Sequence, residues 1–328
     1  MRAVVVTTPG STDSLELVEL AIPAPGPGEL TIDVEYAGVG FVDTLFRSGA
    51  LALPTPFTPG IEVTGRVREV GPDVTGFEPR QLVAALLNDF GRGMRAGGYA
   101  EVATAHSTMA AVLPEGADLA RIAGAAINGV TAWIALHDLA RLGVHDDVLV
   151  LGASGGLGGI TGRLAAIRPA HRVIGVIGRP TAHVSEAATW TDVVLAAELD
   201  TAVDELTGGR GVDVVIDPVG GDQRTIAFAK LAPFGRHIVL GNASGHDPAL
   251  SGDAAWHGTR LLQGLSLGAV AHLVPQQVGA ALSAVVDLIH RGVLVEPAPS
   301  VLPLERVAEV HQALEDRTAP AKTVLALR

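Results

Sequence analysis

The chain has 328 residues, a formal net charge of −12 and no cysteine. Its length predicts two domains of ordinary size. Without cysteine there can be no disulfide, thiolate zinc site or cysteine nucleophile, so a metal could be held only by His, Asp or Glu, and the composition suits a cytoplasmic protein. The acidic balance, with two lysines among the 23 basic residues, gives no basic stripe, so we expect no nucleic-acid partner.

The N-terminus gives no sign of a secretion signal. Arg2 is followed by a short strand-like run that soon reaches Pro9 and Gly10, which is too short for the apolar core of a signal peptide. The longest weakly polar stretch, Ile122 to Leu136, is shorter than the ~20 residues that a bilayer requires, and it carries polar residues. We therefore expect a buried helix in this stretch and no membrane partner.

Residues 1–121 predict a small, mostly β domain. Runs of β-branched and apolar residues, each of strand length, are separated here by proline and glycine. The expected strands are Leu30–Tyr36, Glu62–Val70, Gln81–Ala85 and Tyr99–Ala103.

Residues 122–270 predict a second domain of a different kind. Hydrophobic strands alternate with helical stretches, which is typical of βαβ units and a parallel sheet. The expected strands are Val148–Leu151, Arg172–Ile177, Asp192–Leu195, Val212–Ile216, Arg236–Leu240 and Gly264–Val270. Six strands are enough for the two mononucleotide-binding halves of a Rossmann doubly wound sheet, so the predicted fold class is α/β.

The turn after the first of these strands is the most informative feature of the chain. A buried strand, a glycine-bearing turn and a helix are how proteins hold a dinucleotide pyrophosphate, with the helix N–H groups facing the phosphates. Gly155 would let the backbone approach the phosphates, and Gly158 would let the helix pack close to the strand. Ala153 replaces the first glycine of the usual fingerprint, and a turn that only changes chain direction is the alternative. The residues assigned to the cofactor are Ala153, Ser154, Gly155, Gly156, Leu157 and Gly158.

The end of the second strand indicates which dinucleotide binds. NAD-specific folds have Asp or Glu there for the ribose hydroxyls, whereas this chain has Gly178-Arg179-Pro180. A guanidinium can bind the 2′-phosphate that a carboxylate would repel. We therefore expect NADPH, bound at Gly178 and Arg179. In the alternative, Arg179 is an exposed loop residue and His183 takes its place.

The segment 271–328 predicts a return to the first domain. Val278–Gly292 is an amphipathic helix that ends in His-Arg-Gly, and another helix follows from Leu304 to Leu314. The final strand, Thr323–Leu327, is apolar and needs a sheet, for which the β domain is the nearest candidate. The expected domains are therefore 1–121 with 271–328, and 122–270.

Five segments carry a resemblance to a known family: Ala37–Gly49, Pro59–Gly65, Gly97–Glu101, Asp217–Gly221 and Gly241–Gly245. In sequence and spacing the chain is similar to the zinc-free quinone oxidoreductase branch of the medium-chain dehydrogenase/reductase superfamily. The resemblance implies an N-terminal GroES-like β domain, a Rossmann domain that binds NADPH, and a C-terminal segment that returns to the β domain. It also implies that Asp217, Val219, Gly241 and Asn242 bind the cofactor, although a plain turn would explain Gly241-Asn242 as well.

Two positions depart from the zinc alcohol dehydrogenases of the same superfamily. The resemblance places Gly40 and Ile61 where those enzymes have a metal-binding Cys and His, and a chain without cysteine cannot hold their second zinc. Catalytic zinc polarises the substrate oxygen and stabilises the developing alkoxide. Without metal, we expect hydride transfer from NADPH to an acceptor that conjugation already makes electrophilic, namely a quinone or an α,β-unsaturated carbonyl.

Four residues are candidates for the catalytic site. The resemblance places Asp43 and Arg47 in the segment that lines the substrate cleft, and Thr131 near the nicotinamide. Asn128 lies three residues before Thr131 and therefore shares its helix face. The alternatives are structural: Asp43 could cap a helix beginning near Thr44, and the other pair could belong to a buried helix.

Two further functions compete with this one. The first is reduction of an enone or enoyl intermediate in secondary metabolism, which a pocket with few polar side chains would suit. The second is binding of NADPH without turnover, in a structural or regulatory role.

The last strand of the dinucleotide domain predicts an oligomer. The segment Leu265–Val270 is apolar for an edge strand, and an open edge invites pairing with another chain. We expect two copies to join there into a continuous sheet across a two-fold axis.

Overall fold

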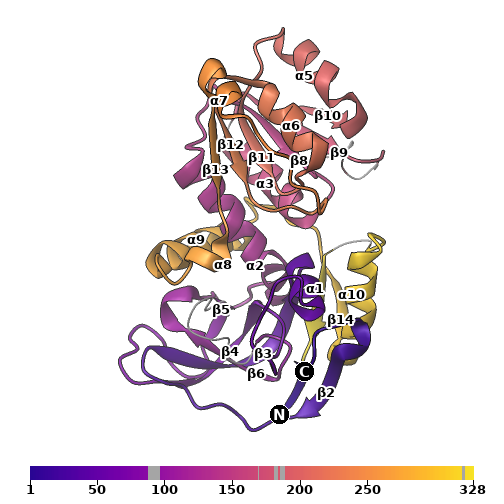
Figure 1. Ribbon diagram of the computed structural model, residues 1–328. Helices are drawn as coiled ribbons and strands as arrows, with labels where there is room; N and C mark the ends of the chain where they lie inside the picture. Colours follow the sequence, from indigo (N-terminus) through magenta and orange to yellow (C-terminus); the bar gives the residue numbers. More distant parts are fainter. Residues whose placement is uncertain (88–96, 169, 181–183, 185–188, 320–321) are drawn as a thin grey trace. The chain divides into compact units, whose positions relative to one another are not determined.

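The computed structural model describes the chain except residues 88–96, 169, 181–183, 185–188 and 320–321. It divides into two compact units, the first made of Met1–Ile127 with Gly268–Arg328 and the second of Asn128–Leu267. The boundaries expected from the sequence lay at 121/122 and 270/271. Figure 1 labels the elements of each unit.

The first unit is built on a seven-stranded sheet. Its strands are β3 (Glu29–Val39), β4 (Glu62–Val70), β5 (Leu82–Leu86), β6 (Val102–His106), β7 (Ala110–Val112), β14 (Ser300–Pro303) and β15 (Thr323–Ala326). The order is β14-β15-β3-β4-β5-β7, and β6 pairs with β3. β15 lies antiparallel to β3, with Thr323 opposite Val39, so the C-terminal strand returns to the N-terminal domain as predicted.

The core of this unit comes from the inward side chains of these strands. Alternation along β3 buries Leu30, Ile32 and Val34, and Val307 and Val310 pack on the same core cluster. β1 (Arg2–Val6) and β2 (Leu15–Glu19) form a separate antiparallel pair. The helical elements are η1 (Thr12–Ser14), α1 (Phe41–Ser48), η2 (Ser107–Met109), α9 (Pro275–His290), η5 (Leu304–Arg306) and α10 (Val307–Glu315).

The second unit is a parallel six-stranded sheet. Its strands are β8 (Asp147–Leu151), β9 (Arg172–Ile177), β10 (Asp192–Leu195), β11 (Val212–Asp217), β12 (Leu231–Val239) and β13 (Leu261–Gly264), and the order is β10-β9-β8-β11-β12-β13. In chain order this is 3-2-1-4-5-6, the order of dinucleotide-binding sheets, and the order reverses between β8 and β11. The helical elements are α3 (Gly156–Ile167), η4 (Ala196–Glu198), α5 (Leu199–Thr207), α6 (Gly221–Ala229) and α7 (Gly252–Gly258).

One long helix contains the boundary between the two units. It consists of α2 (Leu119–Ile134) and a π-helical turn, η3 (Ala135–Leu139). By length and composition alone this helix could cross a membrane, and 67% of its apolar window is buried. That burial is what the core helix of a folded domain shows, which agrees with our interpretation of this stretch.

The last strand of the second unit was placed wrongly from the sequence. β13 ends at Gly264, and Leu267–Val270 forms the short helix α8. The register pairs Leu261 to Gly264 with the end of β12, after which the chain leaves the sheet. A short apolar run has no periodicity that separates a strand from a buried helical turn, which is why the pattern misled. The segment expected to pair two copies is therefore not an edge strand; β13 is.

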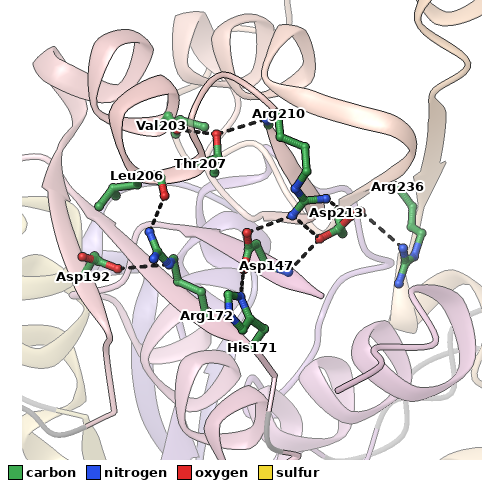
Figure 2. Close-up of polar contacts among 11 residues, drawn as sticks. Asp147, His171, Arg172, Asp192, Val203, Leu206, Thr207, Arg210, Asp213 and Arg236 are labelled. Atoms are coloured by element: carbon green, nitrogen blue, oxygen red, sulfur yellow. Dashed lines mark hydrogen bonds and ion pairs between the residues drawn. The ribbon is translucent and has the colours of Figure 1, made fainter. Parts of the chain in front are cut away.

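At the amino edge of the parallel sheet, charged side chains pair with one another. Figure 2 shows Arg210 between Asp147 and Asp213, with His171 on the other side of Asp147. Arg210 Nη1 lies 2.7 Å from Asp213 Oδ1 and Nη2 lies 2.9 Å from Asp147 Oδ2, while His171 Nδ1 lies 2.7 Å from Asp147 Oδ1. Arg236 pairs with Asp146. These contacts join the starts of β8 and β11 and the residue before β9.

Candidate functional site

The glycine turn after β8 has a left-handed residue that the sequence argument did not name. Gly152, and not the following Ala153, adopts a positive φ of 66°. Ala153 is buried, its N–H donates to Val176 O at 2.9 Å, and it packs with Ile177. The left-handed residue that the turn needs is therefore Gly152, one position before the Ala153 that replaces the first glycine of the fingerprint. The doublet Gly152-Ala153 was the sequence signal for this shift.

Close packing of α3 against this turn depends on Gly158. A Cβ at that position would lie 2.2 Å from the carbonyl oxygen of Gly152, a distance that no side chain can occupy. α3 begins at Gly156 with Gly155 as its N-cap, and Ser154 to Gly156 are exposed. The first N–H groups of a helix have no intrahelical partner and carry partial positive charge. The strand, turn and helix predicted from the sequence are thus present, and the residues at the start of the helix are exposed.

Asn128 lies beside this helix N-terminus. A Cβ on Gly156 would be 2.9 Å from Asn128 Nδ2, so the amide of one candidate site residue contacts the backbone of another. Thr131 is one turn further along α2 and is buried. The structure therefore brings Asn128 to the glycine turn, and its proposed catalytic role remains a prediction.

The end of β9 presents Gly178 and Arg179 at the surface. Both residues are exposed directly after the strand, and a Cβ on Gly178 would meet nothing within 4 Å. His183, the alternative to Arg179, lies outside the described residues. Behind the turn, the ring of Trp190 packs against α3 and β9, where a Cβ on Gly162 would lie 2.1 Å from the indole. No carboxylate stands at the position where NAD-specific folds have one.

Asp217, expected at the cofactor, has a different set of contacts. Its side chain is fully buried, and its carboxylate accepts hydrogen bonds from four donors of its own unit. The donors are Val219 N and Gly220 N, both at 2.8 Å, Arg224 Nε at 2.5 Å and His237 Nε2 at 3.1 Å. Asp217 therefore shapes the loop that carries Val219, and these contacts favour an indirect role over direct cofactor contact.

The charge state of Asp217 follows from these donors. Burial acts to raise the pKa of Asp217, but hydrogen bonds from His237, Arg224 and Gly220 outweigh it and hold the pKa below its usual range. The carboxylate therefore stays ionised inside the unit.

Asp43 caps the first helix from an unexpected position. α1 begins at Phe41, not near Thr44, so Asp43 is the third helical residue and its carboxylate reaches back to Gly40 N at 2.8 Å. It also accepts from Gly60 N at 3.2 Å. The capping function that we considered is present, with a different geometry: the carboxylate ties the helix start to the loop before β4.

Asp43 belongs to a buried group of ionisable side chains. Burial raises the pKa of Asp43 to about 6, although the hydrogen bond from Gly40 acts in the opposite direction. Burial, and then the neighbouring Asp43, raise the pKa of Tyr99 well above its usual value. The Tyr99 hydroxyl lies 3.3 Å from His311 Nε2, and burial, with nearby Arg47, lowers the pKa of His311 to about 3. The sequence named Asp43 but gave no signal that these groups meet.

Arg47 is held inside the first unit. Its side chain is buried, Nη1 donates to Gly10 O at 2.8 Å, and Nη2 pairs with Glu315 of α10. These contacts favour a structural role, and the catalytic assignment stays a prediction. A second partly buried pair joins Lys322 Nζ to the buried Glu62, whose Oε1 lies 2.8 Å away, while Glu62 Oε2 accepts from Ile127 N at 2.7 Å.

Gly241 and Asn242 follow β12, at the same edge of the sheet as the glycine turn. Asn242 is exposed, and its Oδ1 accepts from Ser244 Oγ at 3.0 Å. Carboxyl edges of parallel strands are where open α/β sheets bind ligands, next to the point where strand order reverses. The turns after β8, β9, β11 and β12 therefore share one edge. Among the residues that the structure describes, no group of three or more His, Asp or Glu side chains is placed to hold a metal ion.

Two family models match the chain. One described as "Alcohol dehydrogenase GroES-like domain" matches residues 26–115, and one described as "Zinc-binding dehydrogenase" matches residues 190–325. The first match lies within the first unit, and the second covers the later part of the parallel sheet and most of the C-terminal segment.

Solved structures and characterised relatives resemble the chain over its whole length. The native structure of a mycobacterial quinone oxidoreductase is 31% identical, covers 100% of both chains and has a TM-score of 0.88. Escherichia coli quinone oxidoreductase complexed with NADPH is 25% identical, with the same coverage and TM-score. The synaptic vesicle membrane protein VAT-1 homolog of Homo sapiens is 29% identical over 351 residues, which are 99% of this chain and 86% of that protein.

Proposed function

Since this chain belongs to the quinone oxidoreductase branch of the medium-chain dehydrogenase/reductase superfamily, we propose that it is an NADPH-dependent reductase that transfers hydride to a quinone or an α,β-unsaturated carbonyl. The observation that carries the proposal is the exposed helix N-terminus after β8, located where the order of a 3-2-1-4-5-6 sheet reverses. The oxidoreductase class follows from the family, while the acceptor is our own assignment.

The residues present fit NADPH. The exposed N-terminus of α3 suits a pyrophosphate, because the first N–H groups of a helix donate hydrogen bonds toward negative charge. Arg179, which follows β9 where NAD-specific folds have Asp or Glu, suits the 2′-phosphate. When bound, the cofactor supplies the hydride. Ala153 to Gly158, Gly178, Arg179, Val219, Gly241 and Asn242 are the proposed binding residues, and Asp217 acts through the loop that it shapes.

The residues do not fit the zinc chemistry that the second family description suggests. The chain contains no cysteine, and Gly40 and Ile61 have no ligating side-chain atom. A reaction that lacks a Lewis acid needs an acceptor that is already electrophilic, which favours conjugated carbonyls and quinones over simple alcohols and ketones. Asn128, Thr131, Asp43 and Arg47 remain our candidates for positioning the acceptor.

Stopped-flow oxidation of bound NADPH by a panel of quinones and enones tests the proposal. We expect oxidation without added metal, at a rate that a chelator does not change, and weaker binding of NADH than of NADPH. Oxidation by enones but by no quinone would select the enone-reductase alternative. If neither coenzyme binds, the proposal is wrong; stoichiometric zinc in the purified protein would overturn its metal-free part.

Binding of NADPH without turnover is the second candidate. The match to a vesicle membrane protein along nearly the whole chain favours it, because the fold then occurs in a protein not named for an oxidoreductase activity. The same experiment separates the two candidates: bound NADPH that no acceptor oxidises would favour the non-catalytic function.

A cytoplasmic homodimer completes the proposal. β13 is the edge strand of the parallel sheet, and its Leu261 is 50% exposed. Phe234 and Trp256, which are 80% and 74% exposed, lie with Leu261 around one surface pocket. An apolar open edge invites pairing, so two copies would join β13 to β13. Sedimentation that finds only monomer at micromolar concentration would remove this part of the proposal.

A further inference from the structure

Two loops at the carboxyl edge of the parallel sheet form one body. The first loop, 217–221, follows β11, and the second, 240–247, follows β12. Four backbone hydrogen bonds join them: Leu240 N to Asp217 O at 2.8 Å, Ala243 N to Pro218 O at 3.2 Å, Ser244 N to Val219 O at 2.8 Å and Gly221 N to His246 O at 2.9 Å. Most of the residues of the second loop are nevertheless exposed, so few apolar contacts hold it in place.

The side chain of Arg224 bonds to both loops. It lies in α6, is only 4% exposed, and each nitrogen of its guanidinium has a different partner. Nε donates to Asp217 Oδ2 at 2.5 Å, Nη2 to Gly241 O at 2.6 Å and Nη1 to Asp247 Oδ1 at 2.5 Å. One rigid, planar side chain thus fixes the end of β11 and both ends of the second loop.

Asp217 extends the same network into the first loop. Its other oxygen, Oδ1, accepts from Val219 N and Gly220 N, so the carboxylate sets the backbone of one loop while Arg224 sets the other. Both side chains are almost completely buried, at 0% and 5% exposure. Buried charged pairs of this kind lose their geometry when one partner is removed, because the remaining charge must find another partner or water.

The location of these loops determines what they would hold. In a 3-2-1-4-5-6 sheet, the first half carries the phosphate turn and the residue that contacts the adenosine ribose. The second half, β11 to β13, is therefore left for the nicotinamide mononucleotide. We propose that Arg224 is a positioning residue that holds loops 217–221 and 240–247 as one rigid surface for the nicotinamide half of NADPH. This inference rests on the proposed function.

Affinity for two ligands separates this role from general damage to the fold. Calorimetry would compare NADPH with 2′-phospho-ADP-ribose, which keeps the adenosine half with its 2′-phosphate, the pyrophosphate and the second ribose but has no nicotinamide ring. For Arg224→Lys, which retains the positive charge beside Asp217, we expect about tenfold weaker binding of NADPH and less than about twofold change for the fragment. Asp247→Asn, which cuts only the exposed end of the network, should shift NADPH affinity in the same direction by about threefold.

The matched control is Arg236→Lys. Arg236 belongs to the same sheet but bonds at its amino edge, to Asp146 and to Ala140 O. It should leave the affinities for both ligands within about twofold of the wild type. Hydrogen exchange of the unliganded protein adds a readout that needs no ligand: Arg224→Lys should speed exchange of amides in 240–247 and leave those in 153–159 unchanged.

Each outcome decides between the possibilities. Equal weakening of NADPH and of the fragment, or no weakening of either, overturns the inference, and so does unchanged exchange in 240–247. Wild-type protein that binds neither ligand overturns the proposed function, and the inference with it. Wild-type protein that binds both, combined with a selective loss in Arg224→Lys, supports the inference.

Discussion

At the two ends of β8, the edges of the parallel sheet use polar groups in opposite ways. At the amino edge, Asp147 begins β8 and Asp213 is the second residue of β11, and their carboxylates are paired with Arg210 and His171 (Figure 2). At the carboxyl edge, β8 runs into the exposed N-terminus of α3, whose first N–H groups have no intrahelical partner. Groups that satisfy one another contribute to stability, whereas donors that the protein leaves open are available to a ligand. Substitutions at the two edges should therefore have separable effects.

The largest effect is expected at Gly158. In Gly158→Ala the new Cβ would collide with Gly152 O and push α3 away from the turn, so we expect about a thousandfold weaker NADPH binding, or about 4 kcal/mol. Titration calorimetry measures it. Gly252→Ala is the control, because a Cβ there meets nothing within 4 Å and should leave the affinity unchanged. Tight binding by Gly158→Ala would contradict the proposed use of this turn.

A pH profile extends the comparison to a buried carboxylate that no guanidinium bonds. Asp43, with its pKa raised to about 6, keeps its proton from pH 4 to 6 in the folded protein, whereas the unfolded chain loses it near its ordinary value of 3.8. Its contribution to stability therefore falls as pH rises through this window, by up to about 3 kcal/mol for a shift of two pKa units. The measurement is urea unfolding of wild type and Asp43→Asn at pH 4, 5, 6 and 7.

The difference in unfolding free energy between the wild type and Asp43→Asn isolates the contribution of Asp43. His311, whose pKa is lowered to about 3, has the opposite sign: the unfolded chain takes up a proton below about pH 6.5, so stability falls as pH falls. Both proteins contain His311, so its effect is shared. Stability curves that run parallel across pH 4 to 7 would contradict the raised pKa of Asp43.

The smallest of the three effects is expected at the amino edge. Arg210→Met leaves Asp147 and Asp213 without their guanidinium partner, but Arg210 is half exposed and solvent moderates the loss. We expect about 1–2 kcal/mol lower stability in urea unfolding and an NADPH affinity within about twofold of the wild type. A tenfold loss of affinity would show that the two edges are not separable.

The sequence predicted those parts of the fold that local pattern and spacing determine. β9 and β10 have the bounds that their hydrophobic runs indicated. The apolar strand Thr323–Ala326 pairs with β3 in the sheet of the first unit, where it was expected. Leu265–Val270 failed because a short apolar run does not distinguish strand from helix. The network around Arg224 could not be predicted, because nothing local marks an arginine in a helix as buried or shows that it bonds to Asp217, Gly241 and Asp247.

The candidate site divides in the same way. The strand, turn and helix around Ala153 to Gly158 followed from spacing, whereas the left-handed residue proved to be Gly152. Asp217, which the resemblance assigned to the cofactor, lies at the carboxyl edge of the sheet, but its carboxylate bonds to Arg224 and His237 inside the unit. Spacing predicts where a residue lies along an element; which neighbours compete for its side chain depends on tertiary packing.

The indole of Trp190 has a consequence for how this chain can change over evolutionary time. It occupies room that exists because α3 and β9 have no side chain at Gly162 and Gly175, where a Cβ would lie 2.1 Å and 2.8 Å from the ring. The residues at these three positions therefore depend on one another. An orthologue with alanine in place of either glycine must also have a smaller side chain at position 190. A side chain at either glycine alone is therefore blocked, although neither glycine needs to touch a substrate.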